Sequence, residues 1–492
     1  MKLYLFGHDY KYAVEQILLT LFPEERPEYV SEAPSGDRAE LYLYESGLRP
    51  TALCRLFIGG CEYRGRAGVD AGRITDELSR SKYLQRIIKL SFYRAALRSG
   101  KEKPVWGALT GIRPGKLLSK LLEDGMSDRA ALYSFMRDND VSRERALLCL
   151  HTAHAGLDCA RSLLPGDICL YVGIPFCPTR CSYCSFVSQS VQKSMKLIPT
   201  YLEVLYREIE ATAEVVKSLN LRPISVYMGG GTPTTLSAAQ LDILCQKLES
   251  SFDLSALREY TVEAGRPDTI TADKLEALKR HGVTRVSVNP QTMDDKVLEA
   301  IGRKHTARDV LDALDLVSSV GGLQVNMDLI AGLPLDTPET FAYTLDTVLR
   351  LNPENITVHT LALKKGSEIM LGNTQRPEPE AVGKMLDFAN AALFSAGYVP
   401  YYLYRQKYMS GGFENVGWQR AHTENIYNIC IMEELCSIFS VGGGASTKLC
   451  LGSGRIERIF DPKYPTEYIQ SIEKLISDKK RIPELMAQEP VF

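Results

Sequence analysis

Three cysteines in one short loop constrain this chain more than any other feature of its sequence. They belong to the stretch Tyr171–Phe186, which reads Tyr-Val-Gly-Ile-Pro-Phe-Cys-Pro-Thr-Arg-Cys-Ser-Tyr-Cys-Ser-Phe. An apolar run, Ile168–Ile174, comes directly before the cysteines and predicts a buried strand. The Cys-x3-Cys-x2-Cys spacing is formed by Cys177, Cys181 and Cys184. The sequence therefore predicts a strand that ends in a thiol-rich loop.

This spacing has two interpretations, and the neighbouring prolines favour one of them. On a helix, the three cysteines would share one face and would be ordinary core residues. Pro175 and Pro178 disfavour a regular helix, because proline interrupts helical hydrogen bonding and keeps the preceding residue extended. Three thiols also cannot all pair as disulfides. We therefore expect a tight loop that directs three thiolates onto one metal centre.

The number of cysteines indicates the kind of metal centre. Thiolate sulfur suits zinc and iron–sulfur clusters. Structural zinc takes four protein ligands, commonly from two Cys-x2-Cys pairs, and no second pair is present in the sequence. Three thiolates on a cluster of four irons leave one iron open to a small molecule. A [4Fe–4S] cluster is therefore the expected centre.

The composition is that of an ordinary globular protein. The chain has 492 residues, of which 45% are apolar and 24% charged, enough for two or three domains. Its net charge of −2 gives no electrostatic support for binding nucleic acid or an anionic membrane. Neither a membrane-spanning run nor a signal peptide is found, so a cytoplasmic protein is expected. Of the 12 cysteines, those outside the loop show no pairing pattern and are expected to be buried apolar residues or free thiols.

Residues 1–165 are expected to form an N-terminal α+β region of unknown role. Alternating apolar residues predict a half-buried antiparallel sheet, with strands at Lys2–Phe6, Ala39–Tyr44 and Ala52–Glu62. Helical periodicity predicts helices at Tyr12–Leu21, Tyr83–Ser99, Lys116–Glu123, Ser127–Arg137 and Ser142–Leu157. The segment Trp106–Leu117 lacks the first glycine and the hydroxyl of a phosphate-binding loop, so it is interpreted as a turn before a helix.

Strand and helix patterns alternate through residues 166–365. Six strands are expected, at Ile168–Ile174, Ile224–Met228, Glu259–Val262, Arg285–Val288, Gln324–Leu329 and Asn355–Leu361. Helix N-caps are expected at Ser237, Thr306 and Thr337. Six such units predict an α/β fold with a curved parallel sheet, a partial TIM-like (β/α)6 barrel, although the pattern alone also permits an open doubly wound sheet. Either fold places its functional residues at the carboxyl ends of the strands.

Glycines and polar residues follow the expected strands. The second strand is followed by Gly229-Gly230-Gly231-Thr232-Pro233-Thr234, where glycines either let the backbone approach a ligand closely or form a plain turn. Later strands and their ends carry Glu263, Gln291, Arg303 and Asp328. One such residue would usually be structural, but several around a cysteine loop indicate a binding site.

The cysteine loop resembles that of the radical S-adenosylmethionine (SAM) enzymes. The resemblance implies that Cys177, Cys181 and Cys184 hold a [4Fe–4S] cluster whose open iron binds the amino and carboxylate groups of SAM. It also implies that reduction through the cluster cleaves SAM to a 5′-deoxyadenosyl radical.

From Tyr171 to Ala362 the chain is similar to the oxygen-independent coproporphyrinogen III oxidase (HemN-like) family, with spacing matched without gaps from Gln291. The long N-terminal region and the Trp106–Lys116 segment are most similar to its HemZ branch, called coproporphyrinogen dehydrogenase. That family binds two SAM molecules. By position, the first would be held by Tyr171, Gly230 and Glu263. The second would be held by Tyr183, Gly231, Thr232, Gln291, Arg303, Asp328 and Ala362.

The resemblance implies an oxidoreductase that converts coproporphyrinogen III to protoporphyrinogen IX without oxygen. The radical would take a hydrogen from the β-carbon of a propionate, and loss of CO2 and one electron would leave a vinyl group. A flavodoxin- or ferredoxin-type reductant is the expected partner, with no nucleic acid and no membrane span. The alternatives are a heme-binding chaperone on the same barrel and a radical SAM enzyme with another substrate.

Two departures from the related sequences bear on function. The best-known oxidases carry a further cysteine where this chain has Phe186. The heme-chaperone branch carries a His-Asn-x-x-Tyr-Trp signature, which Glu414-Asn415-Val-Gly-Trp418 meets only in part. Glutamate in place of histidine removes an axial heme ligand, so the enzyme interpretation is favoured.

Residues 366–492 are expected to form a C-terminal extension that covers the substrate. A helix from Pro379 to Ala396, a strand at Val399–Tyr404 and a helix at Thr466–Asp478 are predicted. By the resemblance, the turn Gly442–Ser446 would lie over the first SAM. The expected anchors for substrate carboxylates are Arg405 and Arg420.

Overall fold

The fold is described from a computed structural model. It describes residues 1–33, 35–111, 113–184, 194–362, 377–406, 410–452 and 454–488. The chain separates into two compact units, Met1–Leu150 and His151–Phe492. The expected division into domains at residues 165 and 365 stays a prediction.

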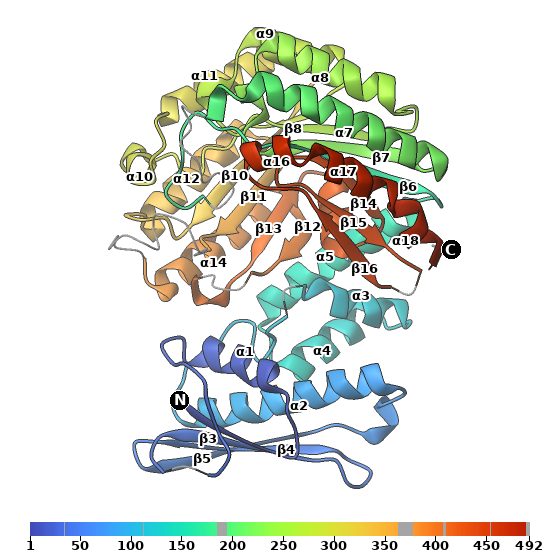
Figure 1. The fold of residues 1–492 in the computed structure, drawn as a ribbon. Helices are drawn as coiled ribbons and strands as arrows, with labels where there is room; N and C mark the ends of the chain where they lie inside the picture. Colours follow the sequence, from blue (N-terminus) through green and yellow to red (C-terminus); the bar gives the residue numbers. More distant parts are fainter. Residues whose placement is uncertain are drawn as a thin grey trace. The chain divides into compact units, whose positions relative to one another are not determined.

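The first unit contains a mixed sheet and helices. Its elements are β1 (Lys2–Phe6), α1 (Lys11–Leu21), β2 (Glu28–Val30), β3 (Arg38–Tyr44), β4 (Thr51–Ile58), β5 (Cys61–Gly68), α2 (Glu77–Arg98), α3 (Gly115–Glu123), α4 (Asp128–Asn139) and α5 (Arg143–Ser162), the last continuing into the second unit. The strand order is β2-β1-β3-β4-β5, and α1 and α2 cover one face (Figure 1).

Two expectations for the first unit are wrong. The sheet is not antiparallel throughout, because β1 pairs in parallel with both β2 and β3. The run Ala52–Glu62, expected as one strand, belongs to β4 and β5, which form an antiparallel hairpin. The turn between them is Gly59-Gly60, with φ of +57° and +80°. The apolar alternation continues across this turn and hides it, whereas the glycine pair is a turn signal.

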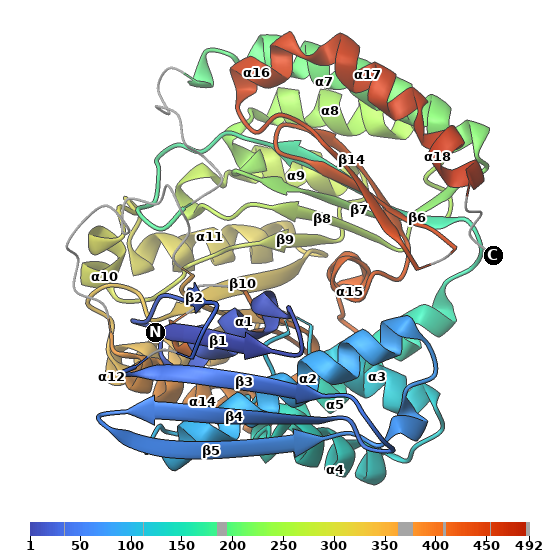
Figure 2. The same ribbon diagram turned by 60° about the horizontal axis from the view of Figure 1, so that its bottom comes forward.

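The second unit begins with alternating strands and helices. These are β6 (Asp167–Ile174), α7 (Ile198–Ser218), β7 (Arg222–Gly230), α8 (Ala238–Ser251), β8 (Glu259–Glu263), α9 (Ala272–Arg280), β9 (Arg285–Ser287), α10 (Asp295–Ala300), α11 (Ala307–Val320), β10 (Gln324–Ala331), α12 (Pro338–Leu351) and β11 (Asn355–Thr360). Strands β6 to β11 are parallel neighbours in chain order, and helices α7, α8, α9 and α11 lie on their outer side (Figure 2). The predicted partial barrel is confirmed. The predicted N-caps form capping boxes at Ser237, Thr306 and Thr337.

The C-terminal residues extend this sheet at both edges. Their elements are α14 (Pro379–Ser395), β12 (Val399–Tyr404), β13 (Asn415–Gln419), α15 (Ile426–Glu433), β14 (Ser437–Gly442), β15 (Ser446–Cys450), β16 (Ile456–Phe460), α16 (Pro465–Gln470), α17 (Ile472–Lys480) and α18 (Ile482–Gln488). In the described part of the unit, the eleven-stranded sheet has the order β12-β13-β11-β10-β9-β8-β7-β6-β14-β15-β16. Strand β14 runs parallel to β6, whereas β13 runs antiparallel to β11. The one helix expected at Thr466–Asp478 is α16 and α17, which both contact α7.

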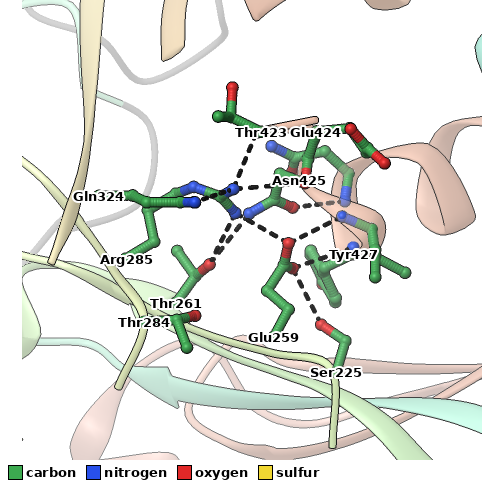
Figure 3. A network of polar contacts seen from close by, with 12 residues as sticks. Ser225, Glu259, Thr261, Thr284, Arg285, Gln324, Thr423, Glu424, Asn425 and Tyr427 are labelled. Carbon is green, nitrogen blue, oxygen red and sulfur yellow. Dashed lines mark hydrogen bonds and ion pairs between the residues drawn. The ribbon is translucent and has the colours of Figure 1, made fainter. Parts of the chain in front are cut away.

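A buried polar network lies at the amino-terminal ends of the barrel strands (Figure 3). Glu259 and Arg285, which begin β8 and β9, form a buried ion pair with an N–O distance of 2.8 Å. Glu259 also accepts hydrogen bonds from the backbone N–H groups of Ile426 and Tyr427, in the first turn of α15. Arg285 donates to the carbonyl of Thr423 at 2.8 Å. These bonds hold the beginning of α15 at the amino-terminal ends of the barrel strands. The cysteine loop follows the other, carboxyl-terminal end of β6.

Candidate functional site

A cavity of about 360 Å³ lies at the carboxyl ends of the barrel strands. Of the predicted site residues, those that line it are Cys177, Cys181, Tyr183, Cys184, Gly230, Gly231, Thr232, Glu263, Gln291, Arg303 and Asp328. An adjoining cavity of about 230 Å³ shares Tyr183, Cys184, Gln291 and Asp328 and adds Ala362. Tyr171 lies directly behind the wall, because a Cβ on Gly230 would lie 3.2 Å from its hydroxyl oxygen. The structure thus brings all the residues predicted to hold the cluster and SAM to one place.

The cysteine loop is fixed by backbone bonds to the barrel. The N–H of Gly231 donates to the carbonyl of Ile174 at 2.7 Å, and the N–H of Thr232 donates to Phe176 at 2.7 Å. Farther along, the N–H of Ser182 donates to the carbonyl of Ile301 at 3.0 Å. These bonds hold the loop from both sides and turn its thiols toward the cavity. Phe186 lies outside the described residues.

Two guanidinium groups flank the cysteine loop. Arg266 donates to the hydroxyl of Thr179 at 2.7 Å and lies 3.9 Å from Cys181 Sγ. Arg303 donates to the Tyr183 hydroxyl at 3.1 Å and to the carbonyl of Asn289 at 2.9 Å. Both cations favour negative charge on the nearby sulfur atoms. The sequence reasoning missed Arg266, although its position just beyond Glu263 and the third strand was a usable signal.

The glycine segment at the end of β7 has no space for side chains. A Cβ on Gly229 would lie 2.8 Å from the Glu263 carboxyl carbon, and one on Gly231 would lie 2.5 Å from the carbonyl oxygen of Phe176. Gly230 has φ of +105°, a conformation that side chains disfavour. Close neighbours therefore require glycine at positions 229 and 231, and the backbone conformation favours it at position 230. Without side chains there, polar backbone groups are left at the cavity wall.

Glu263 is held at the centre of the site. Its carboxylate accepts a hydrogen bond of 2.6 Å from the Tyr227 hydroxyl. Burial raises the pKa of Glu263 to about 7, although the bonds from Tyr227 and from the Gly230 N–H oppose this rise. A carboxylate with such a pKa can accept a hydrogen bond from a ribose hydroxyl or pair with an ammonium group.

Backbone hydrogen bonds hold the segment that carries Gln291 beside β10, which carries Asp328. The Gln291 N–H donates to the Asp328 carbonyl at 2.9 Å, and Gln291 has φ of +68°, a strained backbone for glutamine. Asp328 accepts from Asn326 Nδ2 at 2.9 Å and faces His359 Nε2 at 3.8 Å. Burial opposes a charged Asp328, but the polar contact with His359 and the hydrogen bond from Asn326 outweigh it and lower the pKa of Asp328. His359 is a cavity residue that the sequence reasoning missed.

The residues present fit an iron–sulfur cluster with SAM. Three thiols converge on a cavity beside two cations, and the glycine wall leaves backbone groups accessible to a ligand. Burial raises the pKa of the Cys177 thiol to about 12, so binding of a metal there must displace thiol protons. Metal binding and proton release are therefore coupled at this loop.

The two expected carboxylate anchors differ in their positions. Arg405 is buried, and its guanidinium donates to the carbonyl of Gly412 at 2.6 and 3.0 Å. Arg420 lies beside Glu354, just before β11 begins, and stacks on Tyr398. The expectation for Arg420 is wrong, because it lies at the opposite end of the strands from the cysteine loop.

The fold and this site define a radical SAM protein, and residues 171–348 match the radical SAM superfamily. The chain is 39% identical over 381 residues to the oxygen-independent coproporphyrinogen-III oxidase-like protein HemZ of Bacillus subtilis, covering 76% of each chain. It is 27% identical over 318 residues to the heme chaperone HemW of Haemophilus influenzae, covering 64% of this chain and 79% of that protein. Its fold is also that of coproporphyrinogen III oxidase (HemN) from Escherichia coli, with a TM-score of 0.52 and 24% identity over 65% of this chain and 72% of that chain.

The chain therefore belongs to the HemZ family of oxygen-independent coproporphyrinogen-III oxidase-like proteins. As a radical SAM protein it uses a [4Fe–4S] cluster and SAM, which confirms the predicted cofactors. The helices in the described ranges are all too short or too polar to cross a membrane.

Proposed function

We propose that this protein catalyses the oxidative decarboxylation of coproporphyrinogen III to protoporphyrinogen IX without oxygen. One observation carries the proposal: three thiols, two guanidinium groups and a set of polar strand-end residues line a single cavity. The HemZ relative, similar over three quarters of both chains, supports the choice of substrate.

Within this proposal the cluster ligands are Cys177, Cys181 and Cys184. The first SAM contacts Tyr171, Gly230 and Glu263, as the backbone approach at Gly230 and the carboxylate beside it support. A second SAM occupies the adjoining cavity and contacts Tyr183, Gly231, Thr232, Gln291, Arg303, Asp328 and Ala362. The two adjoining cavities, which share several residues, support two molecules lying side by side.

A bound cluster would supply one electron for the cleavage of SAM to methionine and a 5′-deoxyadenosyl radical. The protein holds and orients its ligands: Glu263 accepts from SAM, and Arg303 pairs with a methionyl carboxylate. The aromatic side chains of Tyr402 and Tyr404 line the same cavity and give the tetrapyrrole an apolar surface. A flavodoxin- or ferredoxin-type protein would supply the electrons.

A heme chaperone is the second candidate, favoured by the HemW relative, of which 79% is matched. The sequence Glu414-Asn415 weakens it. Glu414 is buried, and Asn415 accepts a hydrogen bond from the Thr360 N–H at 2.9 Å, so this pair has a structural role in the sheet. On this interpretation the same barrel would hold heme and transfer it.

One anaerobic experiment separates the two functions. Protein with a reconstituted cluster is given SAM, reductant and coproporphyrinogen III, with the Cys177→Ala variant as control. We expect protoporphyrinogen IX, two CO2 per tetrapyrrole, and 5′-deoxyadenosine, none of which the variant forms. A preparation that cleaves SAM, leaves coproporphyrinogen III unchanged and retains stoichiometric heme through gel filtration would favour the chaperone.

A further inference from the structure

A second group of cysteines lies inside the barrel, away from the cysteine loop. The Sγ atoms of Cys169 in β6, Cys430 in α15 and Cys436 just before β14 all lie within 4.8 Å of one another. Cys159 in α5 adds a fourth sulfur, 4.0 Å from that of Cys430. All four side chains are buried. Three distant parts of the chain, at residues 159, 169 and 430–436, thus bring four buried thiols together, with Cys159 beside Cys430.

This group is separate from the proposed cluster site. Cys169 precedes the end of β6 by five residues, which is about 16 Å of strand, and the cysteine loop follows that end. Cys169 also lies close enough to Glu259, in the network of Figure 3, for the two to interact electrostatically. The cysteine group therefore lies toward the amino-terminal ends of the strands, beside α15.

The spacing of the Cys169, Cys430 and Cys436 sulfurs suits a single tetrahedral ion. Cys159, whose sulfur lies outside this group of three but contacts that of Cys430, would move toward the ion as its fourth ligand. With zinc–sulfur bonds of about 2.3 Å, tetrahedral geometry places ligand sulfurs about 3.8 Å apart. The Cys169–Cys436 distance is 3.7 Å and the Cys159–Cys430 distance is 4.0 Å. A disulfide needs about 2.05 Å. A multi-iron cluster puts its cysteines on different irons and so spreads their sulfurs farther apart.

We propose that Cys159, Cys169, Cys430 and Cys436 bind one structural zinc ion. Binding replaces the thiol protons, which pass to solvent as the site forms during folding. The ion joins α5, β6, α15 and the segment that leads into β14, so it fastens the edge at which β14 pairs with β6. The proposal does not depend on the reaction at the other end of the barrel.

Metal analysis tests the site once the cysteine loop can no longer bind zinc. The triple variant Cys177→Ala, Cys181→Ala, Cys184→Ala is purified under anaerobic conditions from cells supplied with zinc. We expect one zinc per chain and no iron. Adding Cys430→Ala should lower the zinc content at least tenfold. Adding Cys245→Ala should not, because Cys245 is equally buried but its sulfur contacts the Tyr260 hydroxyl.

Cobalt spectroscopy keeps the proposal testable where Cys430→Ala fails to fold. The triple variant refolded with Co²⁺ should show thiolate-to-cobalt charge transfer in the near ultraviolet and the visible bands of a tetrahedral site. Adding Cys159→Ser should shift those visible bands without abolishing them. The proposal would be overturned if the triple variant contained no zinc or if its cobalt form lacked the charge-transfer band. A Cys169–Cys436 disulfide in the anaerobic protein would also overturn it. None of these readouts depends on decarboxylation.

Discussion

Glu263 is the residue whose burial gives the clearest pH dependence. Its pKa is about 7 in the folded protein, against an ordinary value of 4.5. Between pH 4.5 and pH 7 the Glu263 carboxyl has lost its proton in the unfolded chain but keeps it in the folded protein. The free energy of unfolding therefore falls as pH rises toward and through 7. The loss is at most about 3 kcal/mol. Glu263→Gln should therefore raise the melting temperature at pH 8 and have little effect at pH 4.5.

Differential scanning calorimetry at both pH values measures this effect. Glu276→Gln is the matched control, because Glu276 is an exposed residue of α9. It should change the melting temperature equally at the two pH values. An equal effect for Glu263→Gln would contradict the assignment of a buried, proton-binding carboxyl group.

The loop cysteines should be individually essential for the cluster. Cys177→Ala, Cys181→Ala and Cys184→Ala each leave two thiolates, which hold a cluster of four irons poorly. Iron content and the visible absorption of anaerobic protein should fall to background in all three variants. Cys245→Ala should retain both. A full cluster in any loop variant would show that the ligands lie elsewhere.

Arg303 should affect one SAM and spare the other. Its guanidinium is fixed by Asn289 and Tyr183, so it can present a preformed fork to a carboxylate. Arg303→Lys keeps the charge near the loop but loses the fork. Loss of one charge-assisted bond costs about 1.5–3 kcal/mol, or about ten- to a hundredfold in affinity. Isothermal titration should show two SAM sites in the wild type and one weakened site in the variant; a single site in both would refute the two-site assignment.

At the scale of elements, one buried cation joins three parts of the second unit. Lys479 of α17 pairs with Glu208 of α7 at 3.1 Å and with Asp461, which follows β16, at 3.4 Å. Glu208 also accepts a hydrogen bond of 2.8 Å from the N–H of Gly442, the last residue of β14 before the glycine turn. The network thus fixes the glycine turn that adjoins the start of the cysteine loop.

Replacing Lys479 should lower the stability of the fold far more than replacing Lys480. Lys479→Met leaves two buried carboxyl groups without their partner, which costs about 3–5 kcal/mol. Lys480→Met, at an exposed position on the same helix, should change stability little. Thermal unfolding compares the two variants. Equal melting temperatures would mean that the buried carboxyl groups are neutral without Lys479.

Elements with a strong local pattern could be predicted from the sequence. The six barrel strands and the capped helices were found because their apolar runs and caps are local signals. Strand β14 was missed because all of its residues are buried, so no alternation marks it. Strand β2 has three residues and is too short for a pattern.

The site was predictable where its residues share a motif and not where only folding joins them. The loop cysteines and the strand-end residues could be predicted as site residues because each follows a predicted strand. Arg266 follows a predicted strand as Glu263 does, and this signal was overlooked. His359 was not found, because what makes it informative is its contact with Asp328, distant in sequence. The buried cysteine group comes from three distant parts of the chain with no common spacing.

For the molecule as a whole, the edge between β6 and β14 should decide whether the barrel persists. Without β14, β6 would present an unpaired and mostly apolar edge, which promotes association between chains. A chain ending at residue 433 should therefore aggregate or elute as oligomers in gel filtration. A chain ending at residue 488 is the control and should behave as the full chain does. A monomeric, cluster-binding product from the shorter chain would show that β14 is dispensable.

The same edge imposes an order of events on synthesis. Cys169 and Cys436, which meet beside this edge, are 267 residues apart. The ribosome therefore delivers β6 long before its second neighbour exists, and the cysteine loop is made while the barrel is still incomplete. Contacts so distant in sequence form slowly and leave the nascent chain open to misassociation. We therefore expect iron to be delivered to this protein only after the chain leaves the ribosome. The yield of folded protein in cells should depend on chaperones that cover the unpaired edge of β6 until β14 has been made.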